Sequence, residues 1–153
     1  FMVRLSMGYP DLESQVDIIR QRQGRNPVDT VRPLAGASHI RTMKQVAEHV
    51  KIKDEVIMYA AKLCEATRSA EAVEQGASPR AVLALVQMAK ASALMDGRDH
   101  VIPQDISSVF IDVCAHRLVL TARARIRKET EADVLKKILS DVKPPAVAEG
   151  KAE

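Results

Sequence analysis

The segment from Gly76 to Ala81 has the residue types and spacing of an anion-binding site. Ser78 followed by Pro79 is a strong start signal for a helix, because serine caps a helix N-terminus and proline fits its first position. This start places Arg80 at the second helical position, where a cation opposes the helix dipole by about 0.3–1 kcal/mol. The free N–H groups of a helix N-terminus nevertheless bind anions, and a guanidinium adds a planar fork that suits phosphate.

Spacing alone leaves two interpretations of Arg80 open. In one, its guanidinium contacts a phosphate together with the start of the helix. In the other, the side chain simply points into water. A segment of this length does not decide between them.

Histidine and cysteine do not gather into a predicted metal or catalytic site. Cys64 and Cys114 fall within apolar helical patterns, which favours two buried, reduced thiols over a disulfide. No Ser/His/Asp or Cys/His arrangement suggests nucleophilic catalysis. We therefore predict no metal site and no catalytic residue in this chain. The histidines are scattered, and no pair has metal-ligand spacing with a third ligand nearby: His39, His49, His100 and His116.

The other arginine-containing segments are predicted to be structural. Arg98, in the turn after the fourth predicted helix, is expected to be a surface turn residue or a partner of the region around Asp99. His116-Arg117 is expected to be a structural junction. A basic stretch suits a solvated face, with attraction of an acidic partner as the alternative; it contains Arg117, Arg123, Arg125, Arg127 and Lys128.

Two periods of apolar residues divide the chain into an N-terminal segment and a helical remainder. Residues 1–7 alternate with a period of two, which predicts a strand, although no second strand is evident to pair with it. Gly8-Tyr9-Pro10 breaks this pattern. From Asp11 onwards the apolar period is helical, apart from the links between helices.

Start and stop signals divide the helical remainder into about five to six helices. The predicted segments run from Asp11 to Gly24, from a Ser38 cap to Val50, from an Asp54 cap to Thr67, from Ser78 to Met95, from Pro103 to Val113, and from a Thr130–Asp133 capping box to Leu139. The fourth is apolar nearly all round and is expected at the centre of the bundle. Residues 25–37 and 69–77 are predicted connectors. Residues 117–127 fit both periods, and we expect a short extended piece at 118–121.

Composition supports this all-α fold and argues against several classes of protein. Aromatic residues make up 3% of the chain and tryptophan is absent, so aliphatic residues must build the core, which suits close helix packing. The net charge is +3 with both signs mixed, which indicates a solvated surface and makes nucleic acid an unexpected partner. No apolar run of about 18 residues and no export signal is present, so we expect a cytoplasmic protein. The chain begins at Phe1, inside a predicted element, and we expect it to be a fragment.

Several separated motifs resemble the helical C-terminal lid of MoxR-type AAA+ ATPases. They are Gly76–Ala81 before an apolar helix, Gly97-Arg98-Asp99, Val101-x-Pro103-x-Asp105 and His116-Arg117-Leu118. Phe1–Leu5, leading into Gly8-Tyr9-Pro10, is similar to the family's last core strand and its passage into the lid. The resemblance runs in order from Phe1 to about Val142. It implies a core strand and hinge at 1–9, a helical lid at 10–142 and a flexible tail at 143–153.

The resemblance also implies roles for particular residues. In the family, the arginine of the Gly-Ala-Ser-Pro-Arg motif is the sensor 2 residue, which contacts nucleotide phosphates. That role maps onto Arg80, with Ser78 and Pro79 at the helix start, and it stays open whether Arg80 acts on its own subunit's nucleotide or a neighbour's. Gly8-Tyr9-Pro10 would form the hinge. The family's phosphate loop and acidic pair are absent from this sequence, so the chain is expected to be catalytically inert by itself.

For the full-length protein, the resemblance implies ATP and Mg²⁺, with neither expected to be bound by this chain alone. The implied partners are the protein's own AAA+ core, neighbouring subunits of a ring-shaped homo-oligomer, a von Willebrand-type protein and a client protein. The implied activity is chaperone-like and regulatory. The client and the number of subunits do not follow from the sequence.

Two other classes of protein remain open at this stage. The helix at 78–95, followed by Gly97–Asp105, also resembles the loop and third helix of histone-fold proteins, which would indicate a DNA-binding module. The balanced charge argues against this class, because non-specific DNA binding depends on neutralising phosphates. The remaining alternative is a stand-alone helical bundle for protein interaction.

Overall fold

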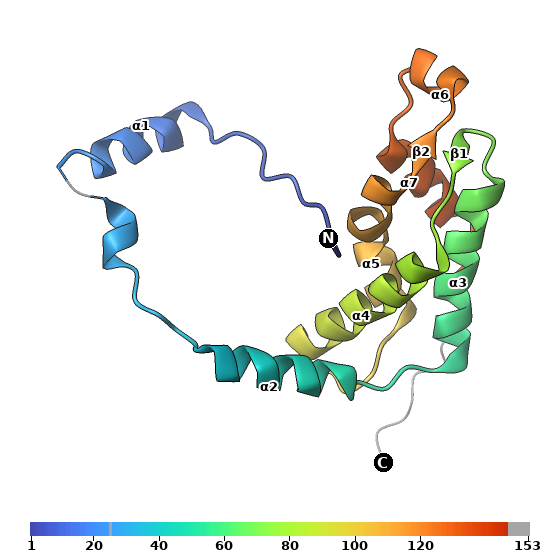
Figure 1. Ribbon diagram of the computed structural model, residues 1–153, viewed down its shortest axis with the longest axis horizontal. Coiled ribbons are helices and arrows are strands. Elements are labelled where there is room, and N and C mark those ends of the chain that lie inside the picture. The colour runs from blue at the N-terminus through green and yellow to red at the C-terminus, as the bar shows by residue number, and fades with distance from the viewer. Residues whose placement is uncertain (25, 147–153) are drawn as a thin grey trace. The chain divides into compact units, whose positions relative to one another are not determined.

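The computed structural model of the protein describes residues 1–24 and 26–146. Within them the protein is mainly helical, with two very short strands (Figure 1). The elements are α1 (Leu12–Gln21), η1 (Pro27–Thr30), α2 (Ala37–Glu48), α3 (Asp54–Ser69), β1 (Val73–Gln75), α4 (Pro79–Met95), α5 (Pro103–Cys114), η2 (Ala115–Arg117), β2 (Val119–Leu120), α6 (Ala122–Ile126) and α7 (Glu131–Asp141). The chain divides into two compact units, Phe1–Arg4 with Gln45–Glu153, and Leu5–Lys44.

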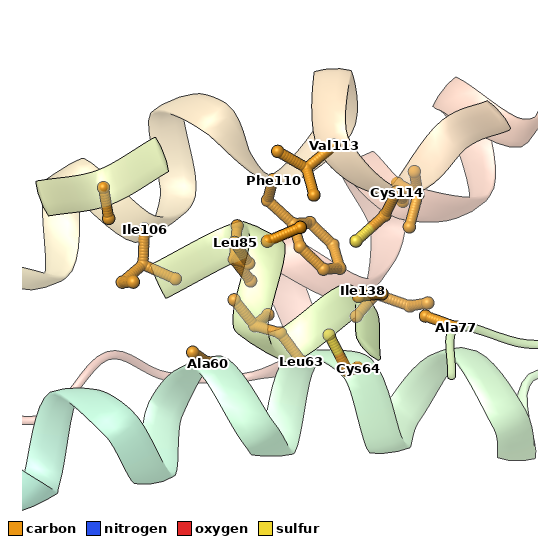
Figure 2. Packing of buried hydrophobic residues seen from close by; sticks show 14 of the residues in the cluster. Ala60, Leu63, Cys64, Ala77, Leu85, Ile106, Phe110, Val113, Cys114 and Ile138 are labelled. Carbon is orange, nitrogen blue, oxygen red and sulfur yellow. The ribbon is translucent and has the colours of Figure 1, made fainter. Parts of the chain in front are cut away.

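The larger unit is built around α5, which packs against α3, α4 and α7. Figure 2 shows Leu63 of α3, Leu85 of α4 and Phe110 of α5 in one buried cluster. Burying a side chain of this size contributes about 1.5–3 kcal/mol. The predicted fourth helix, α4, does contribute to the core, but the helix that packs against most of the others is α5, and Leu83 of α4 is 67% exposed. Most buried residues of α4 are alanines, whose small side chains allow neighbouring helices to approach closely: Ala81, Ala84, Ala89 and Ala93.

A two-stranded antiparallel sheet lies beside the helices of the larger unit and was only half predicted. Strand β2 falls inside the extended piece expected at 118–121, whereas β1 falls in the segment expected to be a plain connector. Val73 pairs with Leu120, and the Thr121 N–H donates to the Ala72 carbonyl at 2.9 Å. A strand of three residues is too short to show an alternating pattern, which is why β1 was missed.

Helix α6 follows β2 directly and raises the number of α-helices in the described residues to seven, above the predicted five to six. Thr121 caps it by accepting a hydrogen bond from the Ala124 N–H at 3.2 Å. The Thr130–Asp133 capping box of α7 is confirmed. There the Thr130 N–H donates to Asp133 Oδ2, and the Asp133 N–H donates to Thr130 Oγ1, both at 3.2 Å.

Two predicted caps are displaced. Helix α2 begins at Ala37, so Ser38 lies inside the helix; before it, the Gly36 N–H donates to His39 Nδ1 at 3.1 Å. Helix α3 begins at Asp54 itself, after Lys53. A carboxylate within the first turn is still favoured there, because it faces the positive end of the helix dipole.

The smaller unit, Leu5–Lys44, contains α1, η1 and most of α2. Asp11 caps α1, with its carboxylate accepting the Ser14 N–H at 2.8 Å. None of the α1 residues is buried. The predicted division between residues 9 and 10 does not coincide with the boundaries of this unit. Of the predicted tail, residues 143–146 form no helix or strand, and 147–153 lie outside the described residues.

Residues 1–7 do not form the predicted strand. A strand is stabilised by a ladder of hydrogen bonds to a neighbouring strand, and the described part of the chain offers this segment none. Instead, the Arg4 N–H donates to the Asp112 carbonyl of α5 at 3.0 Å. That this segment belongs to an ATPase core stays a prediction.

Candidate functional site

The backbone of Ala77, immediately before the start of α4, is held by the end of α3. The Ala77 N–H donates to Thr67 Oγ1 at 2.8 Å, and Arg68 Nε donates to the Ala77 carbonyl at 2.9 Å. Thr67 is fully buried, and its hydroxyl donates in turn to the Cys64 carbonyl at 2.6 Å. A buried polar group left without a partner costs about 1–3 kcal/mol. These hydrogen bonds therefore define where the chain enters α4.

Gly76 lies against the backbone of α3 and has no room for a side chain. A Cβ atom added at Gly76 would lie 2.7 Å from Arg68 Cα and 2.8 Å from Arg68 N and Cγ. Two of these atoms belong to the helix backbone and cannot turn aside. Glycine is needed here for the close approach of two backbones. Gly76 and Ala77 together dock the start of α4 on α3.

Arg80 lies in the first turn of α4 and is exposed. Ser78 occupies the N-cap position and Pro79 the first helical position, as predicted, although the Ser78 side chain makes no capping hydrogen bond. The first turn contains no acidic residue. Among the described residues, none forms an ion pair or a side-chain hydrogen bond with Arg80. Its guanidinium is therefore free to bind an anion; this exposure agrees with both interpretations that the sequence left open.

The far end of α4 is joined to α5 by an ion pair that sequence reasoning missed. Arg98 Nη1 donates to Asp105 Oδ2 at 2.7 Å, and Arg98 Nη2 donates to Asp105 Oδ1 at 2.6 Å. Asp105 is only 4% exposed and also accepts the Ile102 N–H at 2.8 Å. Hydrogen bonding to Asp105 raises the pKa of Arg98.

The prediction of Arg98 as a surface turn residue or a partner of the Asp99 region is correct only in part: Arg98 also donates to the His100 carbonyl at 3.1 Å and to Asp96 Oδ2 at 2.9 Å, but its pairing with Asp105 was not predicted. Asp105 is the third residue of a helix that begins at Pro103, where a carboxylate accepts backbone N–H groups. An arginine in the turn before the helix can reach both oxygens of such a carboxylate. An arginine in the turn and an aspartate at the third helical position were therefore the sequence signal from which the Arg98–Asp105 pair could have been predicted.

The predicted hinge residues lie in the smaller unit. Gly8 has a φ of +67°, a left-handed conformation that favours glycine. Tyr9 is fully exposed, and the Pro10 carbonyl accepts a hydrogen bond from Gln15 Nε2 at 3.0 Å. The structure therefore separates the hinge residues and Arg80 into different units.

Both cysteines are free and buried, as predicted. The neighbouring Cys64 thiol, and then burial, raise the pKa of Cys114. In residues 1–24 and 26–146, no three His, Cys, Asp or Glu side chains gather as a metal site. In the same part of the chain, no helix has both the length and the apolar character needed to cross a bilayer.

Comparison with known proteins shows to which protein family these features belong. Residues 65–138, from the end of α3 into α7, match the family model described as the AAA lid domain. The chaperone MoxR1 of Mycobacterium tuberculosis is 33% identical over 156 residues, which covers 96% of this chain and 41% of MoxR1. Residues 65–138 are an AAA lid domain of the MoxR type. The docked start of α4, Arg80 and the Arg98–Asp105 pair all lie inside this lid domain.

Two further relatives extend the likeness beyond the lid domain. YeaC of Bacillus subtilis is 29% identical over 145 residues, which covers 95% of this chain and 45% of YeaC. The crystal structure of a candidate ATPase from Cytophaga hutchinsonii matches with a TM-score of 0.86 and 27% identity, covering 95% of this chain and 47% of that chain. The chain therefore spans less than half the length of these relatives. The matches favour the lid over the histone-like and stand-alone alternatives.

Proposed function

We propose that this lid serves a chaperone-like AAA+ ATPase and that Arg80 is its sensor 2 residue. One observation supports the proposal: Arg80 presents an exposed guanidinium, without an ion pair in residues 1–24 and 26–146, on a helix start that α3 holds in place. A planar guanidinium beside a helix N-terminus suits a phosphate group. The match of residues 65–138 to the AAA lid domain supports the same role.

In this proposal ATP with Mg²⁺, held by the rest of the protein, supplies the negative charge that Arg80 senses. The chain itself supplies no hydrolytic group and is inert alone. Thr67 and Arg68 fix the backbone just before α4, so an attraction between Arg80 and phosphate would move α3 and α4 together. ATP shifts the equilibrium between two lid positions only by its difference in affinity for them.

The proposed partners follow from the same family. They are the protein's own AAA+ core, neighbouring subunits of a ring-shaped homo-oligomer, a von Willebrand-type partner and a client protein. Gly8, Tyr9 and Pro10 are the proposed hinge, and the cytoplasm is the proposed location. MoxR1 is named as a chaperone, and we extend that role to this protein as part of the proposal.

The test replaces Arg80 in the full-length protein with alanine and with lysine. Hydrogen bonds to charged groups are worth about 1.5–3 kcal/mol, so Arg80→Ala should lower nucleotide affinity or nucleotide-dependent turnover by about ten- to a hundredfold. Arg80→Lys keeps the charge but loses the planar fork and should fall between wild type and Arg80→Ala. Circular dichroism and thermal unfolding should be unchanged, because Arg80 is exposed and forms no ion pair or side-chain hydrogen bond with the described residues.

The matched control is Arg125→Ala. Arg125 is also exposed in a short helix of the lid and forms no ion pair within the described residues. Its replacement should leave affinity and turnover unchanged. If Arg80→Ala retained wild-type affinity and wild-type turnover, Arg80 would not be the sensor.

A further inference from the structure

The first residues of the chain are bound by Arg117, at the end of η2. Arg117 Nη2 donates to the Phe1 carbonyl at 2.9 Å and to the Met2 carbonyl at 3.3 Å. Arg117 Nε donates to the Val113 carbonyl of α5 at 2.8 Å. This last bond orients the guanidinium, so that its outer nitrogen faces the N-terminal segment. One arginine therefore bridges the end of α5 and the backbone of residues 1–2.

Two further contacts hold the same segment. The Arg4 N–H donates to the Asp112 carbonyl at 3.0 Å, and Val3 packs, half-buried, against the core. His116 Nε2 also lies 3.3 Å from the Phe1 carbonyl. His116 Nδ1 is buried and has no partner among the described residues. These contacts explain why Phe1–Arg4 group with the larger unit instead of with Leu5–Lys44.

We propose that Arg117 is a latch that holds residues 1–4 on α5 by binding the backbone carbonyls of Phe1 and Met2, and so makes this segment and the lid helices one moving body. The physical basis is that the guanidinium binds carbonyl oxygens, which every residue carries, so the latch recognises an extended backbone and not particular side chains. Helix α5 packs against α4, which bears Arg80, and the latch therefore connects the segment to the sensor helix. Arg117 is a positioning residue in this scheme.

The latch restricts how the lid helices can move relative to residues 1–4; this restriction rests on the proposed function. Arg4 and Gln45 belong to the same compact unit, so the chain leaves that unit at residue 5 and returns to it by residue 45. Rotation at Gly8-Tyr9-Pro10 alone cannot move the lid helices relative to residues 1–4. The Arg117 contacts must open first.

Amide hydrogen exchange of Arg4, measured by NMR in the 153-residue chain without nucleotide, tests the latch. We expect this amide to be protected in the wild type, because it donates to Asp112 inside the docked segment. Arg117→Ala should lower its protection by about tenfold or more, since bonds from a charged donor are lost. Arg125→Ala, which removes an exposed arginine without a partner in the described residues, should leave it within about twofold of the wild type.

A second pair of variants separates the latch from damage to α5. Val3→Ser weakens the docked segment without altering α5, and it should also lower the protection of the Arg4 amide. Leu5→Ser is its control, because Leu5 is 71% exposed. If Arg117→Ala also lowered the protection of amides within α5, the Val3→Ser variant would decide whether the segment is docked. Lower protection of the Arg4 amide in Val3→Ser would then support the latch.

Two results would overturn the proposal. One is an Arg4 amide that exchanges in the wild type as fast as in an unfolded chain. The other is unchanged protection at Arg4 in either Arg117→Ala or Val3→Ser. Because no nucleotide takes part, these results do not depend on whether Arg80 senses phosphate.

Discussion

The Thr67 hydroxyl and the Ala77 amide are joined by a 2.8 Å hydrogen bond inside the core, across ten residues of sequence. The bond links the last turn of α3 to the residue before the N-cap of α4. Arg80 lies three residues further along the chain, so its place on the lid depends on this link. Gly76 belongs to the same arrangement, because its lack of a side chain lets the chain approach Arg68.

Thr67→Val should destabilise the protein by about 1–3 kcal/mol, because the isosteric valine leaves the buried Ala77 N–H without an acceptor. Urea unfolding followed by circular dichroism measures the change. Thr42→Val is the matched control. Thr42 is exposed on α2, and its replacement should change stability by less than about 0.5 kcal/mol. Equal effects of the two substitutions would mean that the Thr67–Ala77 bond contributes nothing particular.

Gly76→Ala should cost about 1–3 kcal/mol, because the new methyl group would collide with the backbone of Arg68. In the full-length protein it should also weaken any nucleotide response that depends on Arg80, since the start of α4 must shift. Gly36→Ala provides the comparison. Its nearest contact is His39 Nδ1 at 3.8 Å, so it should be tolerated within about 0.5 kcal/mol. Thermal unfolding of both variants would show whether the collision at Gly76 is real.

Arg98→Met should cost about 3 kcal/mol, because it leaves the buried Asp105 carboxylate without its cation. Arg123→Met is the control. Arg123 pairs with Glu71 at 3.4 Å, but the two side chains are 70% and 87% exposed, and water screens such a pair. Its loss should cost less than about 1 kcal/mol. A urea midpoint for Arg98→Met close to that of Arg123→Met would contradict the structural role of the Arg98–Asp105 pair.

The start of α7 should make stability depend on pH in acid. The Thr130 hydroxyl and then the Thr130 backbone N–H lower the pKa of Asp133, so the folded state holds this proton less tightly than the unfolded state. The stabilisation is therefore present above the unfolded value of about 3.9 and is lost as the pH falls through the lower folded value.

Asp133→Asn should accordingly lower the urea midpoint at about pH 6, and the difference from the wild type should shrink at about pH 3. Glu74→Gln is the control, because Glu74 is exposed in β1 and lies outside every ion pair of the described residues. A difference in urea midpoint between wild type and Asp133→Asn that stayed constant from about pH 6 to about pH 3 would contradict this role of Asp133.

Signals within a few residues were sufficient to predict much of the lid. Ser78-Pro79 marks the start of α4, Thr130 and Asp133 form the capping box of α7, and the extended piece at 118–121 contains β2. The motif resemblance correctly indicated the MoxR-type AAA lid domain. These predictions succeed because caps, prolines and apolar periods act on the local backbone, and local backbone geometry repeats from one protein to another.

The sequence by itself determined the six longer helices, where most of them begin, and that Arg80 stands in the first turn of α4. Only the tertiary structure decided that Thr67 binds Ala77, that Arg98 binds Asp105, and that Arg117 reaches Phe1 across 116 residues of sequence. In the sequence, each of these polar side chains is equally suited to an exposed surface. Their partners follow from how α3, α4 and α5 pack, because a hydrogen bond needs two atoms within about 3 Å, and that proximity comes from the burial of residues far apart in the chain.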